Sequence, residues 1–309
     1  MKVIFLGTGD FSEIVLKKLD SSKHQVVGVV TQPDKVNGRN GKITFSPVKS
    51  YALERGLPLY QFASISKEGK EDLSAIGADI MVTSAYGQIL SDEIIAICPH
   101  GIINTHASLL PKYRGSSPIQ MAILNGDEEI GTTIMKTVRE VDAGDVVLQR
   151  SIKLNGNENQ EECFDMLADL SATALIEALD MIESGVAKFV PQDHSKATFC
   201  KKLTKEDGQI DFTLTAKEIH NKVRAFYGYP GAYCQSPYGR LKVIKTELTE
   251  SDVDGQAGEV VEAKKERFVV ACGNNTKIAF ITVQGEGGKV MSVGAYTLGR
   301  PLKVGTILK

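Results

Sequence analysis

The first half of the chain alternates short apolar runs with amphipathic segments, and this alternation restricts the possible folds most strongly. Residues 2–7 (KVIFLG) form an apolar run typical of a buried strand, whereas residues 11–20 (FSEIVLKKLD) have the spacing of a surface helix. The same rhythm continues, with further predicted strands at 25–32, 79–85, 101–107, 131–138 and 145–152 and helices at 90–97 and 117–124. It predicts a mostly parallel sheet covered by helices on both faces.

The second half of the chain has a different pattern. Residues 159–185 contain the longest predicted helix, which ends at Gly185. Residues 186–209 show little periodicity and are typical of a connection between domains. After another predicted helix at 214–226, short strands separated by glycines favour a small antiparallel barrel of the five-stranded OB type.

A length of 309 residues exceeds one average hydrophobic core and allows two domains. We therefore predict an α/β protein whose N-terminal domain, residues 1–188, is Rossmann-like with a mostly parallel sheet. A linker at 189–205 then leads to a small antiparallel β-barrel, OB-like, at 206–309.

Composition indicates an ordinary globular protein of the cytoplasm. The N-terminal apolar run stops at Gly7 and Asp10 follows, so the run is too short for a signal peptide. No uninterrupted apolar stretch approaches the length of a membrane span. The 5 cysteines lie more than thirty positions apart without a CxxC, which argues against both a disulfide framework and a structural zinc site.

The formal net charge of −2 conceals an asymmetry. From Thr204 onward there are 15 Lys and Arg against 12 Asp and Glu, or +3, which leaves −5 for the preceding residues. A mild excess of positive charge is compatible with a solvated surface and with a nucleic-acid contact.

Asn104 and His106 are the sharpest chemical signal. Residues i and i+2 of a strand project from the same face, so the amide and the imidazole are expected side by side near the strand's carboxyl end. Ligands of open α/β sheets bind at that end. An amide donor beside a titratable ring suits acyl transfer, although two polar residues satisfied inside a strand end would give the same pattern.

Asp142 and Asp145 lie on a glycine-containing loop just before an apolar strand. A carboxylate from this loop could pair with His106 and fix its tautomer. The alternative is turn chemistry, in which the Asp side chains cap their own backbone. The segment GTGDFS after the first strand is similarly open to two interpretations, a phosphate cradle or a strand-to-helix turn.

Residues 32–49 (QPDKVNGRNGKITFSPVK) form a basic segment after the second predicted strand. We expect its prolines and glycines to exclude regular structure there. Its positive charge comes from Lys35, Arg39, Lys42 and Lys49. The segment is either a solvated loop or a contact to a nucleic-acid backbone, with Arg39 free to insert.

Together these motifs resemble those of the methionyl-tRNA formyltransferase family. The resemblance covers nearly the whole chain, in order and at the family's spacing, through QPDKVNGRNGK, SAYGQIL, INTHASLLPKYRGSSPIQ, TIMK, VDAGDV, VRAFYGYPGAY and GEGGKVM. The run SLLPKYRG after N-x-H is a specific signature of folate-dependent formyltransferases. The basic loop and the C-terminal barrel narrow that group toward its tRNA-modifying member.

The resemblance implies an enzyme that transfers the formyl group of 10-formyltetrahydrofolate to the free α-amino group of methionyl initiator tRNA. It requires no metal, and we expect a monomer. The implied catalytic trio is Asn104, His106 and Asp142. The implied folate site is lined by Ser108, Leu109, Leu110 and Pro111, with backbone at Gln88, Ile89 and Leu90. The implied tRNA contacts are Lys35, Arg39 and Lys42, while Arg114 either touches tRNA or stabilises its turn.

Two other functions remain open at this point. A formyltransferase for a small amine, glycinamide ribonucleotide or an amino sugar, would share the first domain. Glycinamide ribonucleotide enzymes end there, so the barrel argues against them, whereas amino-sugar enzymes can carry an appended domain. A non-catalytic tRNA-binding protein with an inactive transferase domain is the second alternative, and retention of the trio argues against it.

Overall fold

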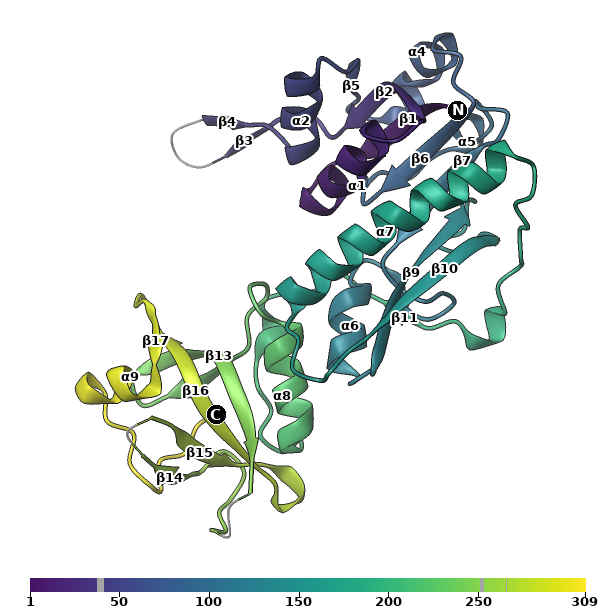
Figure 1. Cartoon of the computed structure of the whole chain (residues 1–309). Coiled ribbons are helices and arrows are strands. Elements are labelled where there is room, and N and C mark those ends of the chain that lie inside the picture. Colours follow the sequence, from purple (N-terminus) through teal and green to yellow (C-terminus); the bar gives the residue numbers. More distant parts are fainter. Residues whose placement is uncertain (38–41, 251–252, 265) are drawn as a thin grey trace. The chain divides into compact units, whose positions relative to one another are not determined.

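The computed structural model describes residues 1–37, 42–250, 253–264 and 266–309, which form two compact units (Figure 1). The first unit consists of Met1–Pro118, Glu129–Lys153 and Phe164–Cys200. The second unit consists of Ile119–Glu128, Leu154–Cys163 and Lys201–Lys309. The first unit is therefore interrupted in the sequence by two short segments of the second unit. The later one, Leu154–Cys163, includes the first residues of α7 (Gln160–Glu183).

A seven-stranded sheet forms the centre of the first unit, in the order β10-β9-β7-β6-β1-β2-β5. The neighbours from β7 to β5 are all parallel, whereas β9 is antiparallel to both β7 and β10. The strands are β1 (Lys2–Gly7), β2 (Gln25–Thr31), β5 (Leu59–Gln61), β6 (Ile80–Ser84), β7 (Ile102–His106), β9 (Glu129–Lys136) and β10 (Val146–Lys153). The predicted mostly parallel α/β sheet is confirmed.

Both faces of this sheet are covered. Successive side chains of β1 point to opposite faces, so neighbouring residues of this strand contact different helices. Ile4 and Leu6 join a buried cluster with side chains from the helical segments α3, α4 and α5. On the other face, a Cβ at Gly7 would lie 2.6 Å from both Phe5 and Ser12, which places Phe5 beside α1. The helices are α1 (Asp10–Asp20), α3 (Ile65–Glu68), α4 (Lys70–Ala75) and α5 (Asp92–Ile95).

The basic segment is more regular than the sequence suggests. Its described residues include a two-stranded hairpin, β3 (Lys35–Asn37) and β4 (Lys42–Thr44), followed by α2 (Pro47–Arg55). The expectation that Pro47 excludes regular structure is wrong, because a proline fits the first turn of a helix, where its missing N–H is not needed. The Ser46 side chain caps that helix by accepting a hydrogen bond from the Lys49 N–H.

The segment that the sequence suggests as a linker contributes to the first unit as far as Cys200. It contains a 3₁₀ turn, η1 (His194–Lys196), and a short strand, β11 (Phe199–Cys200). β11 pairs in parallel with β8 (Arg114–Gly115), which follows β7. A segment without hydrophobic periodicity is therefore folded onto the loop that carries the formyltransferase signature.

The second unit is built on an antiparallel sheet that forms a half-barrel, which confirms the predicted OB-like architecture (Figure 1). The strand order is β12-β13-β16-β15-β14, and β17 pairs with β16. Ile219 and Val223 of α8 pack into the core of this half-barrel. The remaining elements are α6 (Pro118–Leu124), η2 (Glu206–Gly208), α8 (Ala216–Ala225), β12 (Tyr233–Ser236), β13 (Gly239–Thr249), β14 (Val260–Ala263), β15 (Phe268–Ala271), η3 (Gly273–Asn275), β16 (Lys277–Gly285), β17 (Val290–Ser292) and α9 (Val293–Gly299).

Among the residues that the structure describes, no helix has both the length and the apolarity that a bilayer crossing requires.

Candidate active site

The candidate site lies where β6 and β7 end side by side in the first unit. These two strands are parallel and pair Thr83 with Asn104 and Ser84 with Thr105. Their carboxyl ends therefore meet at the same edge of the sheet, where ligands of open α/β sheets bind. The loops that follow them carry SAYGQIL and SLLPKYRG.

The side chain of Asn104 has a defined orientation. Its Oδ1 accepts a hydrogen bond of 2.8 Å from the Thr83 hydroxyl, which is buried. Because that oxygen is occupied, the Nδ2 group points away from Thr83. This group is a hydrogen-bond donor, and it has no partner among the residues that the structure describes. Asn104 is thus half-buried with an N–H group available at the sheet edge.

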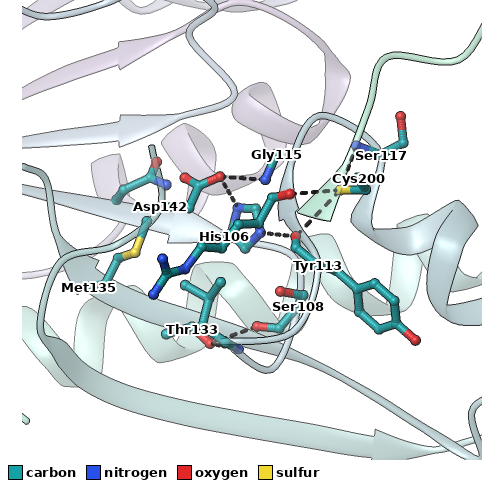
Figure 2. A network of polar contacts seen from close by, with 12 residues as sticks. His106, Ser108, Tyr113, Gly115, Ser117, Thr133, Met135, Asp142 and Cys200 are labelled. Atoms are coloured by element: carbon teal, nitrogen blue, oxygen red, sulfur yellow. Dashed lines mark hydrogen bonds and ion pairs between the residues drawn. The ribbon is translucent and has the colours of Figure 1, made fainter. Parts of the chain in front are cut away.

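His106 is buried on the same strand, two residues further on. Its Nε2 lies 2.9 Å from the backbone oxygen of Tyr113, so this nitrogen carries a proton and donates to that carbonyl. Its Nδ1 lies 3.7 Å from Asp142 Oδ2 (Figure 2). The ring is therefore anchored through one nitrogen and faces a carboxylate with the other.

Asp142 is held from both its side chain and its backbone. Its Oδ2 accepts a hydrogen bond of 2.8 Å from the Gly115 N–H (Figure 2). Its backbone has φ 52°, a left-handed conformation that few residues other than glycine adopt. Among the described residues, Ala85, Tyr113 and Asp142 have positive φ in loops at this sheet edge, and such backbone strain is concentrated at functional sites.

The loop after β7 is fixed by polar side chains from β9 and β10. The Thr133 hydroxyl donates to the backbone oxygen of Ser108 at 2.6 Å and accepts from the Leu110 N–H at 3.1 Å. The Gln149 amide donates to the backbone oxygen of Leu110 and to Thr133 Oγ1, at 2.8 and 2.9 Å. These bonds occupy the backbone oxygens of Ser108 and Leu110 and the Leu110 N–H. The predicted folate-site residues on it are Ser108, Leu109, Leu110 and Pro111, of which Ser108 and Leu110 are buried.

The loop after β6 offers backbone groups instead. The Gln88 side chain is used inside the protein, because its Oε1 accepts from the Ile65 N–H and its Nε2 donates to the Phe62 carbonyl. In contrast, the N–H groups of Gln88, Ile89 and Leu90 have no recorded partner among the described residues. Ile89 is 86% exposed and Leu90 is buried. This arrangement fits the edge of a flat ring with amide-like donors and acceptors.

Three residues whose roles the sequence left ambiguous have internal partners. Arg114 is 1% exposed, and its guanidinium donates to Gln192 Oε1, which favours the turn-stabilising alternative over a contact with tRNA. Ser12 of GTGDFS is buried and donates to the Ser84 carbonyl, so its hydroxyl serves the strand-to-helix turn. Asp145 accepts from the Lys136 N–H through its backbone oxygen.

The predicted tRNA contacts lie outside this network. Lys35 is exposed at the start of β3. Arg39 lies outside the described residues, and of Lys42 only the backbone is described, paired with Asn37 in the hairpin.

Several residues of the site have no signal in the sequence. Thr83 and Thr133 occur in ordinary strand patterns, and Gln192 lies in an aperiodic segment. Cys200 is a lone cysteine whose thiol contacts the backbone oxygens of Tyr113 and Arg114 at 3.5 and 3.3 Å (Figure 2). Burial, with a smaller contribution from Asp142, raises the pKa of this thiol, which disfavours the thiolate.

Comparison with known proteins agrees with this geometry. Residues 1–179 match the family described as formyl transferase, and residues 202–301 match the C-terminal domain of formyl transferases. The chain is 43% identical over 277 residues to a methionyl-tRNA formyltransferase of Sulfurihydrogenibium, covering 89% of each chain. It is 39% identical over 310 residues to that of Desulfotalea psychrophila, covering 100% of this chain and 96% of the relative.

The fold is also similar to solved structures at low identity. An N-formyltransferase from Helicobacter canadensis, in complex with folinic acid and dTDP-3-aminofucose, superposes with a TM-score of 0.66 at 18% identity, covering 91% of this chain and 99% of that one. A glycinamide ribonucleotide transformylase from Symbiobacterium toebii superposes with a TM-score of 0.52 at 18% identity, covering 62% of this chain and 94% of that one. These likenesses concern the fold.

The fold, the site and the two matched domains define the class of protein, a formyl transferase enzyme with an appended C-terminal domain. Relatives at about 40% identity over nearly the full length then decide among the members of that class. The chain belongs to the methionyl-tRNA formyltransferase family. The resemblance inferred from the motifs is thereby confirmed.

Proposed function

We propose that this chain transfers the formyl group of 10-formyltetrahydrofolate to the α-amino group of methionyl initiator tRNA through Asn104, His106 and Asp142. One observation carries the assignment of these residues. An amide whose oxygen is held by Thr83 lies two residues from a buried imidazole that faces a carboxylate at 3.7 Å. A free donor beside a group that can move a proton is what acyl transfer between nitrogens needs.

The reaction exchanges one C–N bond for another. The lone pair of the α-amine attacks the formyl carbon, and the bond from that carbon to the folate nitrogen breaks. The amine loses a proton, and the departing nitrogen gains one. A free α-amine has a reference pKa of about 7.7–8.0, so a useful fraction is already unprotonated at neutral pH.

The enzyme's main contribution is then to the charge that develops on the formyl oxygen. The Asn104 Nδ2 group donates a hydrogen bond to that oxygen as it becomes negative. His106 stabilises the same charge and moves the proton toward the departing nitrogen through Nδ1, the ring nitrogen that is not bonded to Tyr113, while Asp142 compensates the charge on the imidazole. The transfer is direct, without a covalent enzyme intermediate; the nearby Cys200 thiol is buried and contacts the backbone oxygens of Tyr113 and Arg114.

The folate donor would be held between two loops of the first unit. The free N–H groups of Gln88, Ile89 and Leu90 suit the polar edge of the pteridine. The loop from Ser108 to Pro111 would form the apolar wall, since Thr133 and Gln149 occupy the backbone groups of Ser108 and Leu110 on it. No metal is needed for this chemistry.

Substitution of the proposed catalytic residues tests the assignment. Asn104→Ala and His106→Ala should each slow single-turnover formyl transfer by about a hundredfold or more, since loss of one oxyanion donor or acid–base group typically has that effect. Binding of the folate donor, measured on the same preparations, should change little, and both variants should remain folded. Near-normal turnover in either variant would overturn the assignment.

The acceptor is tested separately. Methionyl-tRNA should be formylated far faster than a nucleotide-sugar amine offered at the same concentration, and the reverse order would favour the amino-sugar alternative. Lys35→Ala and Arg39→Ala should weaken the use of tRNA and reduce its salt dependence, because each removes a cation that displaces counterions from phosphates. A salt dependence unchanged in both variants contradicts the proposed role of the basic segment.

We also propose that the enzyme acts as a monomer in the cytoplasm. Every residue assigned above lies within the first unit or its hairpin, so the proposed site needs no second copy of the chain. The acceptor is a charged tRNA, which is made and used in the cytoplasm. Sedimentation at working concentration tests the first statement, since a dimer would contradict it.

A further inference from the structure

The side-chain amide of Gln192 uses all of its hydrogen-bonding capacity inside the first unit. This residue is 6% exposed and lies between α7 and β11. Its Oε1 accepts from Arg114 Nη2 at 2.8 Å and from Arg114 Nε at 3.2 Å. Its Nε2 donates to the backbone oxygens of Asp142 and Gly144, at 2.9 and 2.8 Å. A guanidinium can only donate and a carbonyl can only accept, so these partners fix the orientation of the amide.

The two carbonyls that Gln192 binds belong to Asp142 itself and to Gly144, two residues further along the same turn. The backbone of Asp142 is left-handed, with φ 52°, a conformation that persists only when the surrounding structure enforces it. Gly144 is pressed against β9, since a Cβ at this position would lie 1.9 Å from the Lys136 oxygen. The turn is therefore held by β9 on one side and by the Gln192 amide on the other.

Arg114 carries the other half of the contact. It is 1% exposed and immediately precedes Gly115, whose N–H donates to Asp142 Oδ2. Its guanidinium also contacts His194 Nδ1 at 3.3 Å and Glu140 Oε1 at 3.5 Å. The hydrogen bond from the Gly115 N–H orients the Asp142 carboxylate, and Gln192 is tied to both of its partners. It accepts from Arg114, the residue before Gly115, and it donates to the backbone oxygen of Asp142.

We propose that Gln192, through its paired contacts with Arg114 and the Asp142 turn, is a positioning residue that sets the Asp142 carboxylate beside His106. This inference rests on the role proposed above for Asp142. A residue that aims a reacting group affects the rate of the chemical step, because a displacement of about 1 Å can cost on the order of a hundredfold. A residue that only fills the interior lowers stability without acting through Asp142.

Gln192→Glu separates the two halves of the contact. The carboxylate keeps an acceptor for Arg114, so the buried guanidinium stays paired. It removes both donors to the Asp142 and Gly144 carbonyls and turns an oxygen toward them instead. We expect the single-turnover rate of formyl transfer at saturating folate donor to fall by at least about tenfold, with little change in folate affinity.

A double-mutant cycle with Asp142→Asn then tests whether Gln192 acts through Asp142. In the Asp142→Asn background, Gln192→Glu should reduce the rate by no more than about twofold, since the carboxylate that it positions is gone. An equal loss in both backgrounds, or a Gln192→Glu enzyme with the parent rate, overturns the proposal. The role of Asp142 is tested separately by the single variant Asp142→Asn. If that variant keeps the parent rate, the role proposed for Asp142 is refuted, whatever the effect of a change at Gln192.

Asp193→Ala is the matched control. Its carboxylate caps η1 by accepting from the Ser195 N–H and hydroxyl, and it pairs with Lys196, all on the exposed side of the same segment. This variant loosens the segment locally but keeps the Gln192 amide. It should retain the parent rate, and a loss equal to that of Gln192→Glu would mean that the segment matters only through its stability, which overturns the proposal.

Discussion

The hydroxyl of Thr83 on β6 donates a hydrogen bond of 2.8 Å to the side-chain oxygen of Asn104 on β7. The two residues are register partners in the parallel sheet. An amide can present either its oxygen or its nitrogen to a ligand. Because Thr83 occupies the oxygen of Asn104, the nitrogen is the atom that faces a ligand.

Thr83→Val should therefore lower kcat without unfolding the protein. The substitution keeps the branched shape and removes the hydroxyl, so the Asn104 amide can rotate and turn its oxygen toward the formyl oxygen. We expect a loss of about tenfold in kcat, since part of one oxyanion donor is lost. Thr83→Ser keeps the hydroxyl and should stay close to the parent enzyme, and steady-state kinetics of both variants give the comparison. Equal kcat values in the two variants would contradict this role.

Thr133→Val should act on the folate donor instead. Its hydroxyl ties the backbone of Ser108 and Leu110 together, and its loss leaves buried backbone groups without partners. We expect the KM for the folate donor to rise about tenfold, which corresponds to roughly 1.4 kcal/mol of binding free energy, with a smaller change in kcat. An unchanged KM would show that this loop does not line the donor site.

Gly115→Ala should destabilise the first unit strongly. A Cβ at this position would lie 2.2 Å from the Cys200 backbone oxygen, and φ is 113°. We expect a loss of about 2–4 kcal/mol in the free energy of unfolding. Gly56→Ala is the matched control, because Gly56 also has positive φ (66°) but no heavy atom within 4 Å of the added Cβ. It should cost only about 1 kcal/mol, and similar thermal-unfolding midpoints for the two variants would contradict the argument.

His220 should make the stability of the second unit depend on pH. Burial, with a smaller contribution from the Arg224 guanidinium, lowers the pKa of His220 from 6.5 to about 4, and its Nδ1 contacts the Thr246 hydroxyl. Between these values the unfolded chain binds a proton that the native state does not. The stabilisation is therefore complete above pH 6.5 and is lost as the pH falls toward 4.

The check is the urea midpoint of the second unit at neutral and at mildly acidic pH. The parent protein should lose stability on acidification, and His220→Asn, which keeps a polar group for Thr246 but does not titrate, should lose less. The same decline in both proteins would assign the pH dependence to other groups.

Much of this architecture follows from local patterns. The apolar runs of β1, β2, β6 and β7 predict a buried parallel sheet because only such strands are apolar on both faces. The N-x-H spacing places Asn104 and His106 on one face because the side-chain period of a strand is 2. The hairpin of β3 and β4, and the strand β11, were missed because two or three residues carry too little periodicity to be recognised.

The sequence by itself determined the family, the order of strands and helices along the chain, and the residue types at the site, since these depend on spacing and composition. Only the tertiary structure decided how those residues are held. It sets Thr83 against Asn104, buries Arg114 against Gln192, and brings Gly115 to the Asp142 carboxylate. These partners lie between 21 and 78 positions apart in the chain, and contacts over such separations depend on packing rather than on any local pattern.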